Sequence, residues 1–257
     1  MMAGRYAEAE QWLQRALALE PDSISAKVIY SQAILLGSGD IPRALAAVQG
    51  DDSILKQTRA GLLSYQRKFP EAIALVQSIP DTPDNFSAGV SKANTLATFY
   101  WQAGDKARAK QYFAHSLPQD RAALTKVQGS DQASVWNAVG FDEMGSGNTT
   151  AGLDAIAKSE AILDAAPDSV QNPGQRIFDA EAYAMAGRAD LAVPLLAKTL
   201  STPGIGNSYS PVMLWLDPSW DPIRHDPRFQ ALLQQYAQHK PAVTYDTPPT
   251  ASATATQ

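Results

Sequence analysis

The sequence predicts an all-α fold: a right-handed α-solenoid of about five to six helical hairpins with a C-terminal capping segment. Three observations predict it. An apolar helical pattern recurs along the chain, turn residues separate the helices into pairs, and Ala, Leu and Gln are far more frequent than Val and Ile. A helix-favouring composition combined with internal repetition indicates stacked hairpins, in which each repeat contacts its neighbours.

The opening segment, GRYAEAEQWLQRALALEP, shows the pattern clearly. Gly4 marks a turn, Pro21 marks the end of the helix, and Ala9, Leu13 and Leu17 recur on one helical face. The same arrangement returns in GDIPRALAAV, KFPEAIALVQSI, GDKARAKQYFAHSL and GRADLAVPLLAKTL. An apolar partner helix is expected in SAKVIYSQAILLGS, ILKQTRAGLLSYQ, VSKANTLATFYWQ, ASVWNAVGFDEM and QRIFDAEAYAMA.

Small residues and turn signals predict how the two helices of a hairpin meet. A small residue lies three positions before a larger one at Ala97, Gly140 and Ala180. Two helices approach closely only where a side chain is missing, so these positions are expected at helix contacts. Glycine at the turn supplies the left-handed conformation that ends the first helix. Asp40 and Asp105 are then expected to cap the second helix.

These residues resemble the tetratricopeptide repeat family. Its unit of about 34 residues carries Leu-Gly and Tyr on the first helix, Gly at the turn, Ala and an aromatic or aliphatic residue on the second helix, and Pro at the end. The match is good over residues 1–21, 89–117 and 174–200. In residues 133–166, a glycine-containing turn and the sequence SEAILDAAPD complete a further unit.

The chain departs from the family pattern in three places. Residues 22–80 match weakly, with Pro42 and Pro70 in the first turn of second helices, a position that tolerates proline. Residues 118–132 fit no repeat and are expected to form an extra short helix and a loop. The first repeat has only its second helix, so we expect a fragment of a longer protein; the alternative is a native but imperfect first helix.

Three Asp-Pro pairs dominate SPVMLWLDPSWDPIRHDPRFQALLQQY. Asp before Pro is held extended and accepts backbone N–H bonds, so tight turns and helix starts are expected here. Trp220, Phe229 and Leu233 are spaced to cover the open face of the last hairpin. The segment resembles the closing segment of tetratricopeptide arrays in bacterial signalling proteins, where the array commonly follows a serine/threonine kinase or winged-helix DNA-binding domain.

The predicted organisation has three parts. Residues 1–200 form the helical repeat array, with the first repeat incomplete. Residues 201–239 form the Asp-Pro-rich capping segment and a final helix. Residues 240–257 are rich in Pro, Thr and Ala with almost no apolar bulk. They are expected to form a disordered tail because they cannot offset their ordering entropy.

Composition and motifs predict no catalytic, cofactor-binding or metal-binding residues. The three histidines, His115, His225 and His239, lie on different elements without a ligand partner at suitable spacing. Ser53 and Lys56 match the Ser-x-x-Lys pattern, but its companion motifs are missing and a helix cap is preferred. A net charge of −5 with scattered basic residues argues against nucleic acid.

The sequence does not determine the cellular compartment of the protein. The chain has no cysteine, a feature common to cytoplasmic and periplasmic domains. No apolar run reaches the length of roughly 18 to 20 residues that a membrane span needs, so no membrane insertion is expected. A soluble protein in either compartment fits the sequence.

The resemblance implies a concave groove lined by the first helix of each hairpin. Carried over to this sequence, the candidate peptide-binding residues are Asn94, Thr98, Trp101, Asn137, Phe141, Glu181 and Met185. Asn and aromatic residues suit peptide binding, because amides bond the ligand backbone and rings receive apolar side chains. The alternative for Trp101 and Phe141 is a place in the core between hairpins.

The expected function is therefore a non-catalytic interaction or sensory module that binds a peptide or partner domain. One alternative is the regulatory region of a serine/threonine kinase or of a winged-helix regulator. Another is a structural scaffold or dimerisation array. No cofactor is expected in any of these, and the partner is expected to be protein or peptide.

Overall fold

The computed structural model describes residues 4–82, 85–86, 91–165, 172–202 and 209–245, and those parts contain helices, turns and loops but no strand. Consecutive helices pack in pairs, which confirms the predicted all-α, solenoid-like fold. The array consists of α1 (Tyr6–Leu19), α2 (Ile24–Ser38), α3 (Ile41–Ala47), α4 (Ser53–Tyr65), α5 (Phe69–Gln77), α6 (Lys92–Gln102), α7 (Lys106–Ala123), α8 (Ser130–Ser146), α9 (Thr149–Ala165), α10 (Asn172–Met185) and α11 (Ala189–Leu200).

Five hairpin turns contain one residue with positive φ, which ends the first helix of the pair. Glycine occupies four of these turns, and Arg67 occupies the turn between α4 and α5 with φ 62°. A non-glycine residue in this region carries backbone strain of about 1 kcal/mol. Interactions of the Arg67 side chain must offset it. The glycines are Gly39, Gly104, Gly147 and Gly187.

Aspartates cap two of the helices that follow these turns, α3 and α7, as predicted. The Asp40 carboxylate accepts a hydrogen bond from the Arg43 N–H at 3.1 Å, and Asp105 accepts one from the Arg108 N–H at 3.0 Å. At α4 the capping residue is not Ser53, the residue expected from the sequence. Asp52 accepts from the Ile54 N–H, whereas Ser53 is the first residue of the helix.

Helix α7 is longer than the sequence predicts. It continues through Pro118 to Ala123, so the expectation of a separate short helix in residues 118–132 is wrong. Proline inside a helix removes one backbone donor and its ring crowds the carbonyl of residue i−4, so contacts with neighbouring helices must offset this cost. Here Asn94 of α6 donates to Asp120 at 3.0 Å, which ties the extension of α7 to the adjacent helix.

Two glycines allow α8 and α9 to approach closely. A Cβ atom on Gly140 would lie 3.2 Å from the carbonyl oxygen of Gly152, and one on Gly152 would lie 2.8 Å from the carbonyl oxygen of Gly140. A side chain at Gly152 is therefore excluded by backbone that cannot move without separating the helices. The predicted role of Gly140 at a helix contact is confirmed.

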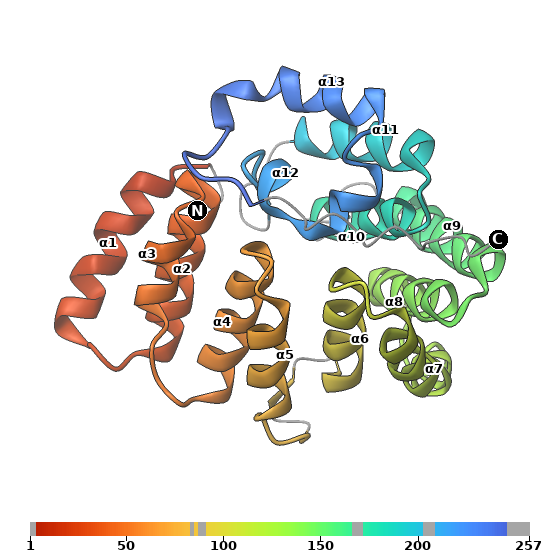
Figure 1. Cartoon of the computed structure of the whole chain (residues 1–257), viewed down its shortest axis with the longest axis horizontal. Helices are drawn as coiled ribbons and strands as arrows, with labels where there is room; N and C mark the ends of the chain where they lie inside the picture. The colour runs from red at the N-terminus through yellow and green to blue at the C-terminus, as the bar shows by residue number, and fades with distance from the viewer. Residues whose placement is uncertain (1–3, 83–84, 87–90, 166–171, 203–208, 246–257) are drawn as a thin grey trace, which may run out of the picture.

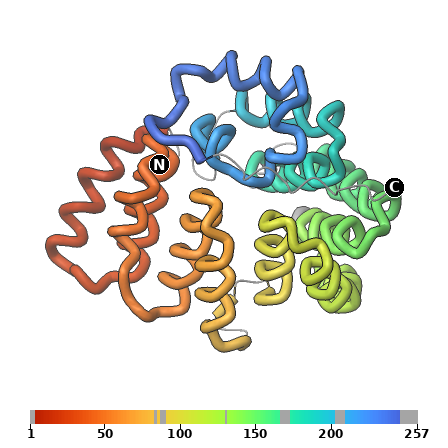
Figure 2. The backbone as a smooth tube through the Cα atoms, viewed as in Figure 1, coloured from red at the N-terminus to blue at the C-terminus, as the bar shows by residue number. Residues whose placement is uncertain are grey.

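The helices from α1 to α11 follow an arc, and the C-terminal part of the chain lies across the opening of this arc (Figures 1 and 2). This part contains α12 (Met213–Leu216), the 3-10 helix η3 (Pro218–Ile223), α13 (Pro227–Gln235) and the 3-10 helix η4 (Ala237–His239). We call Tyr209–Tyr245 the C-terminal strap. One hydrophobic cluster joins residues of α2 and α4, α10 and α11, and the strap, so the core links both halves of the arc.

In the parts of the chain that the structure describes, no helix combines the length and apolar character needed to cross a bilayer.

Candidate binding site

The strap is built by its Asp-Pro pairs and its aromatic residues. Asp217 accepts from the Ser219 N–H at 2.9 Å and so starts η3, and Asp226 accepts from the Arg228 N–H at 2.9 Å and starts α13. The expected role of these aspartates is confirmed. Trp220 and Phe229 are fully buried, and η3 and α13 pack against α10 and α11. The strap thus covers the last hairpin.

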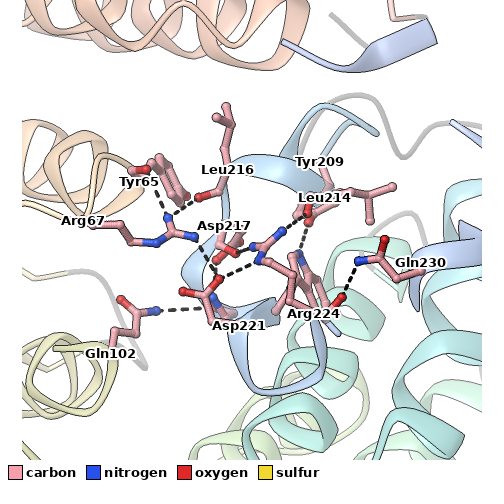
Figure 3. Close-up of polar contacts among 12 residues, drawn as sticks. Tyr65, Arg67, Gln102, Tyr209, Leu214, Leu216, Asp217, Asp221, Arg224 and Gln230 are labelled. Carbon is pink, nitrogen blue, oxygen red and sulfur yellow. Dashed lines mark hydrogen bonds and ion pairs between the residues drawn. The ribbon is translucent and has the colours of Figure 1, made fainter. Parts of the chain in front are cut away.

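The strap also reaches the first half of the array through Arg67 (Figure 3). The Arg67 guanidinium donates to the carbonyl oxygen of Leu216 at 2.6 Å and to the carboxylate of Asp221 at 2.9 Å. Arg224 donates to the same carboxylate at 2.8 Å and to the carbonyl oxygen of Asp217 at 2.9 Å. Because charged hydrogen bonds are stronger than neutral ones, this cluster fixes η3 against the α4–α5 turn.

Three further contacts hold the strap at α2 and α4. The Ser210 hydroxyl donates to the carbonyl oxygen of Leu36 at 2.6 Å, and Gln66 donates to the Tyr245 hydroxyl at 3.2 Å. A Cβ atom on Gly39 would lie 2.8 Å from the Pro241 side chain. The sequence predicts disorder from residue 240, but the structure places residues 240–245 against the array. Residues 246–257 lie outside the described residues.

A cavity of about 490 Å³ remains between the strap and the inner surface of the arc. Its walls come from α2, α4, α8, α9 and α10 and from the strap, so it joins segments far apart in the sequence. Apolar side chains form much of the wall, and Phe178 stands at it with 53% of its surface exposed. The lining residues are Gln32, Leu35, Leu36, Tyr65, Ser134, Leu163, Gly174, Gln175, Ile177, Phe178, Glu181, Tyr209, Met213 and Asp217.

Two carboxyl groups meet at the wall of this cavity. Glu181 of α10 and Asp217 of the strap both line it, and their carboxyl groups lie close enough to interact, a contact that two ionised carboxylates disfavour. Burial, followed by the adjacent Asp217, raises the pKa of Glu181 well above its ordinary value. Burial also raises the pKa of Asp217, against the lowering effect of the Ser219 hydrogen bonds and of Arg67. The pair therefore favours a state with one proton.

Two tyrosines stand beside the carboxyl pair. Burial raises the pKa of both Tyr65 and Tyr209, and the charges of Asp217 and Glu181 raise it further. Both phenols are therefore neutral near neutral pH. The Tyr209 hydroxyl accepts a hydrogen bond from the Trp220 indole N–H at 2.7 Å, which fixes its position at the cavity wall.

Three of the predicted groove residues lie on α6, away from the cavity. Asn94 bonds to Asp120, and the Thr98 hydroxyl donates to the Asn94 carbonyl oxygen at 3.0 Å. Trp101 packs edge-on against Phe113, and the Lys106 ammonium nitrogen lies over the Trp101 ring, 3.2 Å from the ring centroid. The structure does not bring these residues into the cavity.

The other predicted groove residues are divided between packing and the cavity. Asn137 is buried and donates to Asp179 at 2.8 Å. Phe141 and Met185 are partly buried against both hydrophobic clusters, at the contact between neighbouring hairpins. Glu181 alone among the seven candidates lines the cavity.

Sequence reasoning did not select Asp217, Tyr65 or Tyr209 as site residues. Asp217 was assigned only to the start of a helix, a role that it also fulfils. One signal could have indicated the strap contact: the α4–α5 turn carries Arg67 where the other hairpin turns carry glycine. A charged residue retained in a strained conformation indicates that its side chain has a specific partner.

Within the described residues, no group of three or more His, Asp and Glu side chains is arranged to hold a metal ion. Neither a protein-family model nor a curated protein sequence matches this chain.

Proposed function

We propose that this protein is a non-catalytic interaction module of the helical-repeat kind, and that it binds a segment of a partner protein at the cavity beneath the C-terminal strap. One observation carries the proposal: the strap lies across the opening of the arc (Figure 1), and beneath it remains a cavity of about 490 Å³ with apolar walls and a few polar groups. Binding sites commonly have this composition.

The exposed aromatic ring of Phe178 supports this location. Isolated exposed apolar side chains are normal, but Phe178 adjoins a cavity that also presents Ile177, Met213 and Leu36. An apolar side chain of a bound segment would contact these residues. Aromatic residues next to a pocket are frequent energetic centres of protein interfaces.

The test is a selection of random peptides on the immobilised full-length chain, followed by affinity measurements on two alanine variants. Phe178→Ala should weaken the selected peptides about fivefold or more, because it removes an aromatic contact at the cavity. Trp12→Ala is the matched control, since Trp12 is also an exposed aromatic residue, on α1, with 66% of its surface accessible. Equal effects of both variants, or no selected peptide, would contradict the proposal.

A further inference from the structure

We propose that the cavity receives an arginine or lysine side chain of the bound segment, with its cationic group at Glu181 and Asp217 and its aliphatic stem along the apolar wall. This inference rests on the proposed function and names the chemistry of the partner. Three features of the cavity support it.

The first feature is the sign of the charges at the wall. Among the described residues that line the cavity, the acids are Glu181 and Asp217, and no lysine, arginine or histidine is present. The cations nearest to the pair have other partners. Arg67 bonds to Leu216 and Asp221, and Arg224 bonds to Asp221 and to backbone carbonyls. The cavity therefore suits a cation and disfavours an anion.

The second feature is the need of the acid pair for a positive partner. A buried carboxylate is stabilised by hydrogen-bond donors or by a cation. Asp217 receives the Ser219 N–H and is stabilised by the nearby charge of Arg67, whereas Glu181 lies against another carboxyl group. An ammonium or guanidinium group would replace the proton of the pair and could donate to both carboxylates at once, as a guanidinium does in bidentate pairs.

The third feature is the shape of the wall around the pair. Leu35, Leu36, Ile177 and Met213 line the same cavity, so the methylene groups of a long cationic side chain would pack on apolar surface. The ring of Phe178 adds a face over which a cation can pass as it enters. A small inorganic cation would make none of these apolar contacts.

The experiment measures retention of short peptides on the full-length protein. The peptide pools are random except for one central position, which is fixed as arginine, lysine, citrulline or leucine. The arginine and lysine pools should be retained and the citrulline pool should not, since citrulline keeps the shape of arginine without its charge. For the best arginine peptide, Glu181→Gln should weaken binding about ten- to hundredfold, the loss expected for one charged hydrogen bond. Glu71→Gln removes the same charge from an exposed position on α5 and should change the affinity less than about twofold.

The other outcomes separate this inference from the proposed function. Equal retention of the citrulline, leucine and arginine pools, with binding still lost in Phe178→Ala, would overturn the cationic ligand and leave the interaction module standing. Absence of binding by every pool would overturn both. If N-acetylarginine amide alone bound as tightly as the arginine peptides, a free small molecule and not a partner protein would be the source of the cation, and the inference as stated would fail.

Discussion

The two sides of helix α10 place two acids in opposite circumstances. Asp179 faces α8 and α9, where Asn137 and Ser159 donate hydrogen bonds to its carboxylate at 2.8 and 3.0 Å. Glu181, two residues further along, faces the cavity and meets the carboxyl group of Asp217. Residues two apart on a helix point to different sides, so the same helix contributes to the core and to the site.

The difference separates an acid that holds helices together from the acid that we propose binds a cation. Burial raises the pKa of Asp179 to about 7, although its hydrogen bonds to Asn137 and Ser159 lower it. Burial also raises the pKa of Glu181, but beside it lies another acid and open space. A buried acid surrounded by donors holds helices together, whereas one beside an acid and a cavity can accept a cation from outside. Four variants sharpen this contrast.

Asp179→Ala should have the largest effect, a loss of about 2–4 kcal/mol in the free energy of unfolding, because it leaves the amide of Asn137 and the hydroxyl of Ser159 without an acceptor in the core. Chemical denaturation measures it. The control is Asp164→Ala, which removes a largely exposed partner of Arg176 and should change stability by less than about 1 kcal/mol. Similar losses in both variants would show that the network of Asp179 is not a structural centre.

Arg67→Gly should come next, with a net loss of about 2 kcal/mol, since the broken pair with Asp221 outweighs the strain that glycine relieves at φ 62°. Faster amide hydrogen exchange in the strap would show that the contact has opened. The reciprocal control is Gly104→Arg, which puts arginine in a left-handed turn with nothing within 4 Å of its Cβ and should only add strain. An unchanged strap in Arg67→Gly would contradict its anchoring role.

Much of the fold could be predicted because solenoid contacts are local. The turns at Gly39, Gly104 and Gly187 and the caps Asp40 and Asp105 are visible in short sequence windows. The strap crossing was not predictable, because its anchors are long-range: Arg67 and Asp221 lie 154 positions apart. No repeat pattern encodes such a pair. The lining of the cavity was predicted less well: the sequence selected Glu181 from its position on the helix but did not select Asp217.

Asp142→Asn should raise the stability by about 1 kcal/mol at mildly alkaline pH. Asp142 of α8 is fully buried, and among the described residues neither of its carboxyl oxygens has a hydrogen-bond donor. Burial, then the neighbouring Asp120, raises the pKa of Asp142 to about 9. The amide of asparagine can donate to Asp120 without taking up a proton.

The pH dependence of this effect has a definite sign. A folded pKa of about 9 against an unfolded value of 3.8 means that the folded protein binds the extra proton, so stability falls as pH rises from about 4 to about 9. Thermal unfolding across this range should show a steeper decline in the wild type than in Asp142→Asn. Asp154→Asn, an exposed change on α9, should leave the slope unaltered. Parallel slopes for wild type and Asp142→Asn would contradict the assignment.

Glu181→Gln should have the smallest effect on folding, within about 1 kcal/mol of the wild type, because glutamine can donate to Asp217 and the change removes one acid from a pair in which Asp217 is buried and Glu181 is half-buried. The free energy of unfolding from chemical denaturation provides the measurement. A loss as large as that of Asp179→Ala would show that both sides of α10 are structural and would remove the contrast.

The central claim is that a cation displaces the proton held by the pair of Glu181 and Asp217. The other ionisable groups around the pair are Tyr65, Tyr209, Arg67, Asp221 and Arg224; the tyrosines have raised pKa values, and the remaining three form an ion cluster. Near neutral pH the acid pair is therefore the group expected to release a proton when an arginine peptide binds. Asp179, whose pKa is also raised, faces the opposite side of α10. Any proton that it released would still be released in Glu181→Gln, so this variant separates the two acids.

Calorimetric titration of the full-length chain with the best arginine peptide, in two buffers of different ionisation enthalpy, measures this proton directly. The account predicts a net proton release in the wild type that disappears in Glu181→Gln. Binding of the peptide with no proton released, or with the same release in both proteins, would contradict it.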